Sequence, residues 1–258
     1  MRVATVPRAL VVLTTAAVLA ATVPATAGTA TVSCRVKNAT QSQVFTSSSG
    51  QALTDAIASA DAGDLLRVHG TCVGTYTLDK DLTLVGRRSL ADPTTLDADR
   101  QGRVLFVEQG VSAAIRQVIV TGGRSTVGGG GGIAVSEGAE LNVRRSLITR
   151  NKTTGAGGGI VVGGTLRLRS SVVIRNHTDS DGGGIYNFGE VIVKRAAINR
   201  NTADGAGGGL FNEGSASLTG SAVRHNVASS SGGILNVSLL TLESTEVSDN
   251  VPDDCNGC

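Results

Sequence analysis

Short runs in which aliphatic and polar residues alternate recur through the second half of the chain. Leu141 and Val143 flank one polar residue, and Leu166 and Leu168 flank another. Alternation over so few residues predicts β-strands with one buried face. The later pairs of this series are Val191 and Val193, Ala216 and Leu218, and Leu240 and Leu242.

The runs repeat with a nearly constant period, because an asparagine follows each of them at the same offset. The spacings between successive asparagines are 25, 25, 25 and 24 residues. Each repeat also carries a third aliphatic column and a glycine run that ends in an aliphatic residue, as at Gly157 to Ile160. The repeated asparagines are Asn151, Asn176, Asn201, Asn226 and Asn250, and the third column is Ile148, Val173, Ile198, Val223 and Val247.

A period of 25 residues is too short for a strand–helix–strand crossover, and no helical periodicity lies between the runs. The pattern therefore predicts an all-β fold, a single-stranded right-handed parallel β-helix over residues 64–251. Turns that stack about 4.8 Å apart place equivalent residues next to each other in columns. Buried amides in such a column satisfy one another as a ladder, and a shorter ladder is expected at Asn187, Asn212 and Asn236.

The segments before and after the repeats are expected to cover the ends of the coil. Residues 51–63 predict a capping helix, with Leu53, Ala56 and Ile57 at helical spacing, Ser49 as N-cap and Gly63 as the stop signal. Residues 28–50 form an N-terminal extension, and residues 252–258 form a tail. Earlier strands are expected at Leu65–Val68, Leu82–Val85, Val104–Val107 and Ala113–Val120.

Residues 1–27 have the pattern of a signal peptide. Arg2 and Arg8 precede or flank an apolar run from Ala9 to Ala21, and Ala25-Thr26-Ala27 resembles a cleavage site. We therefore expect a secreted, extracellular protein without a membrane span in its mature form. Four cysteines in an exported chain predict two disulfides. Of the three possible pairings we favour Cys34 with Cys72 and Cys255 with Cys258.

Charge is unevenly distributed along the chain. The whole sequence has 23 basic and 21 acidic residues, whereas residues 109–226 have 13 basic and 7 acidic residues. The segment from Val227 onward carries five acidic residues and no basic ones. This balance does not resemble a basic nucleic-acid-binding domain, so we expect no nucleic-acid partner.

The glycine runs ending in Ile160 or Ile185, followed by alternating strands and an [ILV]-x-x-N ending, resemble a known group. They are similar to the repeats of polymorphic outer membrane proteins and related exported bacterial β-helix proteins, whose motifs are GG-x-I and F-x-x-N. The opening, from Leu53 through GDLLRVHGTC to DLTLVG, is similar to that of pectin-lyase-like proteins. The resemblance implies the β-helix fold, which hosts lyases, hydrolases, esterases and adhesins.

Two columns of basic residues are candidates for ligand binding. Arg150, Arg175, Arg200 and His225 each precede a ladder asparagine, and Arg144, Arg169 and Lys194 form a second column. An anionic polymer lying along the coil would relieve the repulsion between stacked like charges. The alternative interpretation is a solvated charged face.

Carboxylates and aromatic rings form two further candidate sites. Asp179 and Asp204 fall on adjacent turns, and Asp181 lies close to Asp179, so they predict a Ca²⁺ site of a polysaccharide lyase with Arg175 or Arg200 as base. The alternative is a pair of solvated turn residues. Tyr186 and Phe211 share one outward position and predict either a platform for a sugar ring or a stack between turns.

These features favour a non-catalytic β-helix protein, without a cofactor, that binds an extracellular or cell-surface polysaccharide. An adhesive or structural module that binds another protein is a second hypothesis. The alternative from the enzyme class is a calcium-dependent polysaccharide lyase. The sequence defines no oligomeric state.

Overall fold

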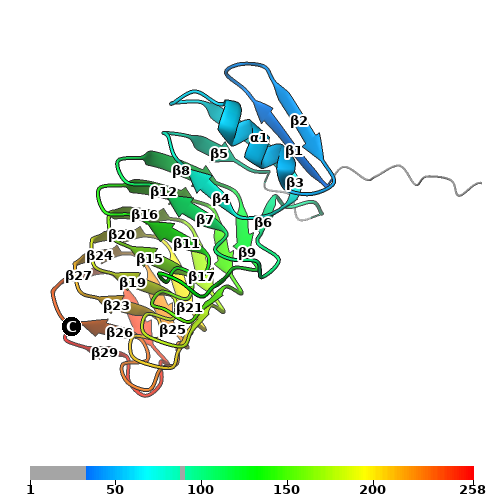
Figure 1. Ribbon diagram of the computed structural model, residues 1–258. Helices are drawn as coiled ribbons and strands as arrows, with labels where there is room; N and C mark the ends of the chain where they lie inside the picture. The colour runs from blue at the N-terminus through cyan, green and yellow to red at the C-terminus, as the bar shows by residue number, and fades with distance from the viewer. Residues whose placement is uncertain (1–32, 88–90) are drawn as a thin grey trace, which may run out of the picture. The chain divides into compact units, whose positions relative to one another are not determined.

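The computed structural model describes residues 33–87 and 91–258. All the described residues belong to one compact unit. The predicted signal peptide, residues 1–27, lies outside them. Among the described residues, no helix is long and apolar enough to cross a membrane. This unit is a right-handed parallel β-helix of about seven turns with one short helix, which confirms the predicted fold (Figure 1).

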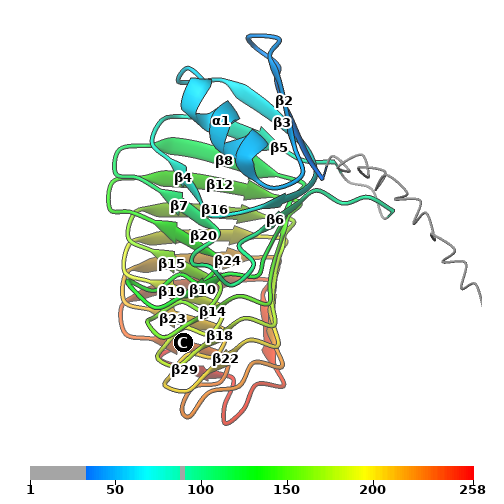
Figure 2. The ribbon, with the colours of Figure 1, turned by 45° about the vertical axis from the view of Figure 1, so that its right-hand side comes forward.

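The turns of the coil visit up to four faces in order, and the third face has a strand in four of the described turns (Figures 1 and 2). The first face consists of β5 (Thr83–Val85), β8 (Ser112–Arg116), β12 (Glu140–Arg144), β16 (Thr165–Arg169), β20 (Glu190–Lys194), β24 (Ser215–Thr219) and β27 (Leu239–Glu243). The second face consists of β6 (Thr95–Asp97), β9 (Ile119–Thr121), β13 (Leu147–Thr149), β17 (Val172–Ile174), β21 (Ala197–Asn199), β25 (Ala222–Arg224) and β28 (Glu246–Ser248).

The other two faces close the turn. The third face is short and consists of β10 (Arg124–Ser125), β14 (Lys152–Thr153), β18 (His177–Thr178) and β22 (Thr202–Ala203), which stack in Figure 2. The fourth consists of β4 (Tyr76–Leu78), β7 (Leu105–Val107), β11 (Ile133–Val135), β15 (Ile160–Val162), β19 (Ile185–Asn187), β23 (Leu210–Asn212), β26 (Ile234–Asn236) and β29 (Cys255–Asn256). β3 (Leu65–Val73) pairs with β5 through its start and with β6 through its end.

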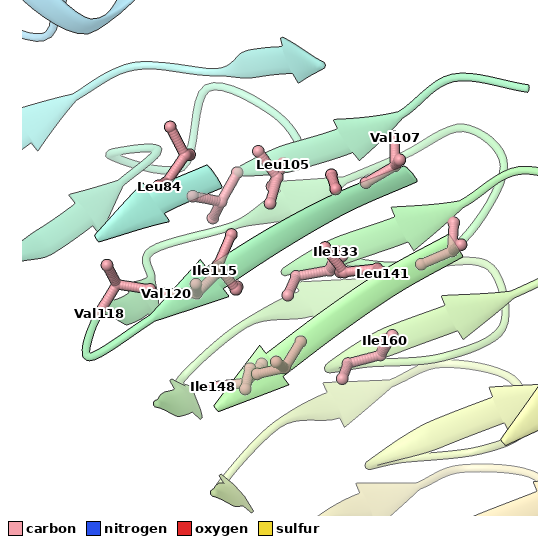
Figure 3. Packing of buried hydrophobic residues seen from close by; sticks show 14 of the residues in the cluster. Leu84, Leu105, Val107, Ile115, Val118, Val120, Ile133, Leu141, Ile148 and Ile160 are labelled. Atoms are coloured by element: carbon pink, nitrogen blue, oxygen red, sulfur yellow. The ribbon is translucent and has the colours of Figure 1, made fainter. Parts of the chain in front are cut away.

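The core consists of the aliphatic columns that the sequence predicts. Leu141 pairs with Leu166, and Leu166 with Val191, on the first face. Ile148 pairs with Val173 on the second face, and all five of these side chains are fully buried. Figure 3 shows Leu141, Ile148 and Ile160, from three different faces, within one packed interior. Because each face buries its inward column against the others, a shift of one residue would expose a whole column to water.

The predicted asparagine ladder runs along the corner between the second and third faces. The backbone N–H and the Nδ2 of Asn176 both donate to Oδ1 of Asn201, at 3.0 Å each. The same Nδ2 also donates to the carbonyl of Ile148 at 3.1 Å. Every buried amide hydrogen of Asn176 thus has a partner, which removes the cost of burying it. The second ladder is also present, with Asn187 donating to Asn212 and Asn212 to Asn236 at 2.7 Å.

A helix and a hairpin cover the N-terminal end of the coil. β1 (Cys34–Asn38) pairs antiparallel with both β2 (Val44–Ser47) and β3, and α1 (Gln51–Ser59) buries Leu53, Ala56 and Ile57 against the core. The hairpin lies in the extension for which the sequence predicts no element. Its β1 is held to β3 by the disulfide Cys34–Cys72, one of the two pairs favoured from the sequence.

The start and stop of α1 differ from the prediction. The N-cap is Gly50 rather than Ser49, because Gly50 lies so close to the Tyr76 hydroxyl and the Val73 carbonyl that no Cβ fits there. The helix ends at Ser59, before Gly63, because Ala60 is already extended, with ψ of 148°.

The strand expected over Ala113–Val120 is also interrupted. Gln117 has a positive φ of 58°, which bends the chain and separates β8 from β9. This corner between the first and second faces recurs in each later turn.

The tail closes part of the C-terminal end. Oδ1 of Asp254 accepts hydrogen bonds from the backbone N–H and the Nδ2 of Asn250, both at 2.9 Å. It therefore takes the place that the next asparagine of the ladder would occupy. β29 pairs with β26, and the disulfide Cys255–Cys258, the other favoured pair, closes a short loop there.

We predict that Asn201→Ala lowers the free energy of unfolding by about 3 kcal/mol, because it removes the Oδ1 acceptor of two buried Asn176 donors, the backbone N–H and Nδ2. Urea unfolding followed by circular dichroism measures the loss. Asn199→Ala is the matched control, since Oδ1 of Asn199 has no hydrogen-bond partner, and its cost should stay within about 0.5 kcal/mol. Equal losses in the two variants would contradict the ladder's structural role.

Candidate functional site

The basic column of Arg150, Arg175, Arg200 and His225 lies along the corner between the second and third faces. The backbone N–H of Arg150 donates to the carbonyl of Arg175 at 3.2 Å. The N–H of Arg200 likewise donates to the carbonyl of Arg224, which directly precedes His225, at 3.1 Å. All four side chains are exposed. The structure thus places the members of this column on successive turns, beside the asparagine ladder.

The backbone conformation of the basic column does not by itself favour arginine. Its members have left-handed φ values of 55°, 57°, 51° and 53°. A side chain with a Cβ costs roughly 1–2 kcal/mol in this conformation, so glycine is favoured there. Gly122 occupies the equivalent position one turn before Arg150, with φ of 69°. The arginines therefore bring a charge to corners where the fold alone favours glycine.

The column extends further than the sequence predicts. The N–H of Arg100 donates to the carbonyl of Gly122 at 2.7 Å, which places Arg100 two turns before Arg150. At the other end, Asp249 follows His225 and has φ of 59°. Alignment of the repeats within the sequence missed Arg100, because the turns before residue 123 do not keep the 25-residue period.

The charges of the basic column have no ion-pair partner among the described residues. Ion pairs do form elsewhere on the coil, between Lys152 and Asp179, between Arg167 and Glu140, and between Arg224 and Glu246. Two like charges about 4 Å apart repel by about 1 kcal/mol even in bulk water. Long side chains relieve this by spreading apart, and an anion that bridges them relieves it further.

The structure brings two of the three predicted carboxylates together and adds a histidine. Nε2 of His177 lies 2.9 Å from Oδ1 of Asp179 and 4.0 Å from Oδ2 of Asp204. These three ligand atoms lie within 4.8 Å of one another, close enough to share one cation. Asp181 does not join them, because its Oδ1 accepts a hydrogen bond from the Ala206 N–H at 2.7 Å.

A lysine already neutralises part of this cluster. Nζ of Lys152 lies 2.8 Å from Oδ1 of Asp179. Its hydrogen bond, followed by that of His177, lowers the pKa of the Asp179 carboxyl below the usual value. Both Asp179 and Asp204 are exposed, so water also screens them. The cluster therefore has the geometry of a metal site, but its charges are already paired in an exposed network of side chains.

The aromatic pair forms a cross-turn stack on the outer side of the fourth face. The ring centroids of Tyr186 and Phe211 lie 5.0 Å apart, with an interplanar angle of 18°. The Tyr186 hydroxyl donates to Glu213 at 2.6 Å, and burial, followed by this hydrogen bond, raises the tyrosine pKa. Phe188, which is 53% exposed, lies 6.3 Å from Tyr186 between ring centroids. Sequence analysis missed Phe188 because it is not part of a column.

Comparison with known protein families, with curated proteins and with solved structures finds no match. The function is therefore interpreted from three surface features of the described coil. They are the basic column, the cluster of His177, Asp179 and Asp204, and the aromatic pair.

Calcium tests whether the cluster binds a metal ion. Because Lys152 already pairs with Asp179, we expect about 10 mM Ca²⁺ to raise the melting temperature by less than about 1 °C. Lys152→Gln frees the carboxylate and should increase the response, as measured by differential scanning fluorimetry. A rise of several degrees in the unaltered protein, abolished by Asp204→Ala, would contradict this expectation and favour the calcium hypothesis.

Proposed function

We propose that this chain is a secreted, non-catalytic β-helix repeat protein that binds an extracellular acidic polysaccharide along its basic column. The observation that carries the proposal is the placement of exposed basic side chains, without an ion-pair partner among the described residues, on successive turns of the coil. The signal-peptide pattern of residues 1–27 and the two disulfides support secretion, because disulfides persist in oxidising compartments.

A polymer gains more from this column than a small anion does. One exposed ion pair contributes only about 0.2–1 kcal/mol. A chain with repeated acidic groups contacts several turns at once, so each later contact forms at high effective concentration. Salt screens exposed charges, with a Debye length of about 8 Å at physiological ionic strength. Binding should therefore depend on polymer length and weaken steeply as salt increases.

We predict that the double variant Arg175→Gly/Arg200→Gly binds polygalacturonate or alginate about tenfold more weakly than the unaltered protein. Two lost contacts of up to about 1 kcal/mol each correspond to roughly this factor. Glycine suits the left-handed backbone at both positions, so the melting temperature should stay nearly the same. Biolayer interferometry on immobilised polysaccharide at low salt measures the affinity.

The matched control removes two basic residues elsewhere. Arg35→Ser/Lys37→Ser takes the same charge from exposed positions on β1 and should bind normally. If both double variants weaken binding equally, net charge rather than the column carries it. If the unaltered protein binds no acidic polysaccharide at low salt, the proposed function is wrong, and an adhesive module for another protein becomes the better hypothesis.

The alternative function is a calcium-dependent polysaccharide lyase, and the observation that favours it is the proximity of His177, Asp179 and Asp204. A lyase leaves an unsaturated sugar that absorbs ultraviolet light. We expect no increase in absorbance when the protein is incubated with polygalacturonate or alginate and Ca²⁺. An increase that disappears in Asp204→Ala would replace the non-catalytic proposal with the lyase.

A further inference from the structure

A groove runs along the corner between the first and second faces, parallel to the direction in which the turns stack. Two adjoining hollows form it, of about 380 and 470 Å³, which share Ser170 and Val172. One wall is the corner column, which we define as Gln117, Arg145, Ser170, Arg195 and Gly220. The other wall is the outward column of the second face, Ile119, Leu147, Val172, Ala197 and Ala222.

The shape of the groove follows from the backbone. Every member of the corner column has a left-handed φ, between 49° and 58°, and its N–H donates to the next turn, as from Arg145 to the Arg169 carbonyl at 3.1 Å. The chain therefore bends in the same way on each turn. Small residues at Ser170, Gly220 and Ala197 leave the hollow open.

Positively charged side chains lie in this groove and beside it. Arg145 and Arg195 belong to the corner column itself, two turns apart. A second set of basic residues, the strand-end column, lies beside them at the ends of the first-face strands. Each of its members pairs in register with the member on the next turn. It consists of Arg116, Arg144, Arg169 and Lys194, all of them exposed.

None of these six side chains forms an ion pair with a described residue. Arg145 and Arg195 also occupy left-handed corners, with φ of 51° each, where Gly220 shows that glycine is accommodated. As in the basic column, the backbone does not select arginine. The basic column lies along the opposite edge of the same second face, whose strands are only three residues wide.

We infer that this groove is the site in which an acidic polysaccharide lies, extended along the coil, with its carboxylate or sulfate groups on Arg145 and Arg195. The inference rests on the proposed function: it widens the binding site from the basic column across the narrow second face to this groove, and it assigns the polymer a direction and a ligand chemistry. Guanidinium groups bind both anions with two parallel hydrogen bonds. The aliphatic wall of Leu147, Val172 and Ala197 packs against the apolar faces of the sugar rings.

The lining of the groove distinguishes between classes of polyanion. Proteins that bind single-stranded nucleic acid stack the bases on aromatic side chains. None of the residues that line the two hollows is aromatic. The groove therefore suits a polymer that presents charges and aliphatic ring faces rather than flat bases.

Groove variants test the inference apart from the proposed function. Arg145→Gly/Arg195→Gly suits the left-handed backbone and should weaken binding of polygalacturonate or dextran sulfate about tenfold, without lowering the melting temperature. Ala197→Glu places a carboxylate in the groove and should weaken it at least as much. Arg145→Lys/Arg195→Lys keeps the charge but loses the paired geometry, so its affinity should lie between that of the unaltered protein and that of the glycine variant.

The dependence of affinity on oligosaccharide length tests independently whether the polymer lies along the coil. The five turns from Ile119 to Ala222 span about 19 Å at the usual spacing of stacked strands. Affinity should rise with oligogalacturonate length up to about this span and then level off.

Each outcome decides the inference. If the unaltered protein binds no acidic polysaccharide, both the inference and the proposed function fail. If it binds, and Arg175→Gly/Arg200→Gly weakens binding while the groove variants do not, the groove is overturned and the proposed function stands. Tighter binding of a single-stranded DNA oligonucleotide than of polygalacturonate would overturn the assigned ligand class.

Discussion

The structure depends on turns of the coil stacking in register. Each buried asparagine amide binds the amide of the next turn, as Asn176 binds Asn201 at 3.0 Å, while the aliphatic columns pack side by side. A shift of one residue would expose those columns and leave the ladder amides unpaired, and both changes are costly in a protein interior. The ladder therefore fixes which residues become neighbours, inside the coil and outside it. Asp254 ends the ladder by supplying one more acceptor.

The same register organises the surface. A residue type that recurs in the sequence becomes a column, and charges that are far apart along the chain become adjacent. Arg145 and Arg150 lie at left-handed corners on either side of a second-face strand. Their columns therefore give this narrow face a row of basic residues along each of its two edges. Positive charge at corners where the backbone favours glycine is difficult to explain by folding alone. It is explained if an anionic chain lies along the coil.

Much of the fold was predictable because the last five repeats keep one period. The core columns and both ladders followed directly from it. The N-terminal hairpin of Cys34–Asn38 and Val44–Ser47, and the strands Tyr76–Leu78 and Thr95–Asp97, were missed because the early turns vary in length and lack the asparagine. The start of the helix was misjudged by one residue: the N-cap is Gly50, where no Cβ fits, although the Ser49 hydroxyl accepts a hydrogen bond from the Gln51 N–H at 3.3 Å.

The candidate site was predictable only where its chemistry repeats on every turn. The basic column was found for this reason. The groove was not, because Ser170 and Gly220 interrupt the arginines of the corner column, and because φ at those corners cannot be read from composition. The histidine of the cluster was missed for a similar reason. His177 lies near Asp179 and Asp204 because adjacent turns stack on the third face. Asp181 is closer to Asp179 in the sequence than Asp204 is, but its side chain accepts a hydrogen bond from a backbone N–H instead.

Engineered disulfides test the register most directly. Ile192 and Ser217 are partners on adjacent turns, and a Cα separation of about 4.8 Å lies within the range that a disulfide bridges. Ile192→Cys/Ser217→Cys should therefore oxidise to an intramolecular crosslink, detected by mass spectrometry of a proteolytic digest. Ile192→Cys/Thr219→Cys places the second thiol two residues further along the same strand, out of reach, and should not. A crosslink in the second pair instead of the first would contradict the register on which the structure depends.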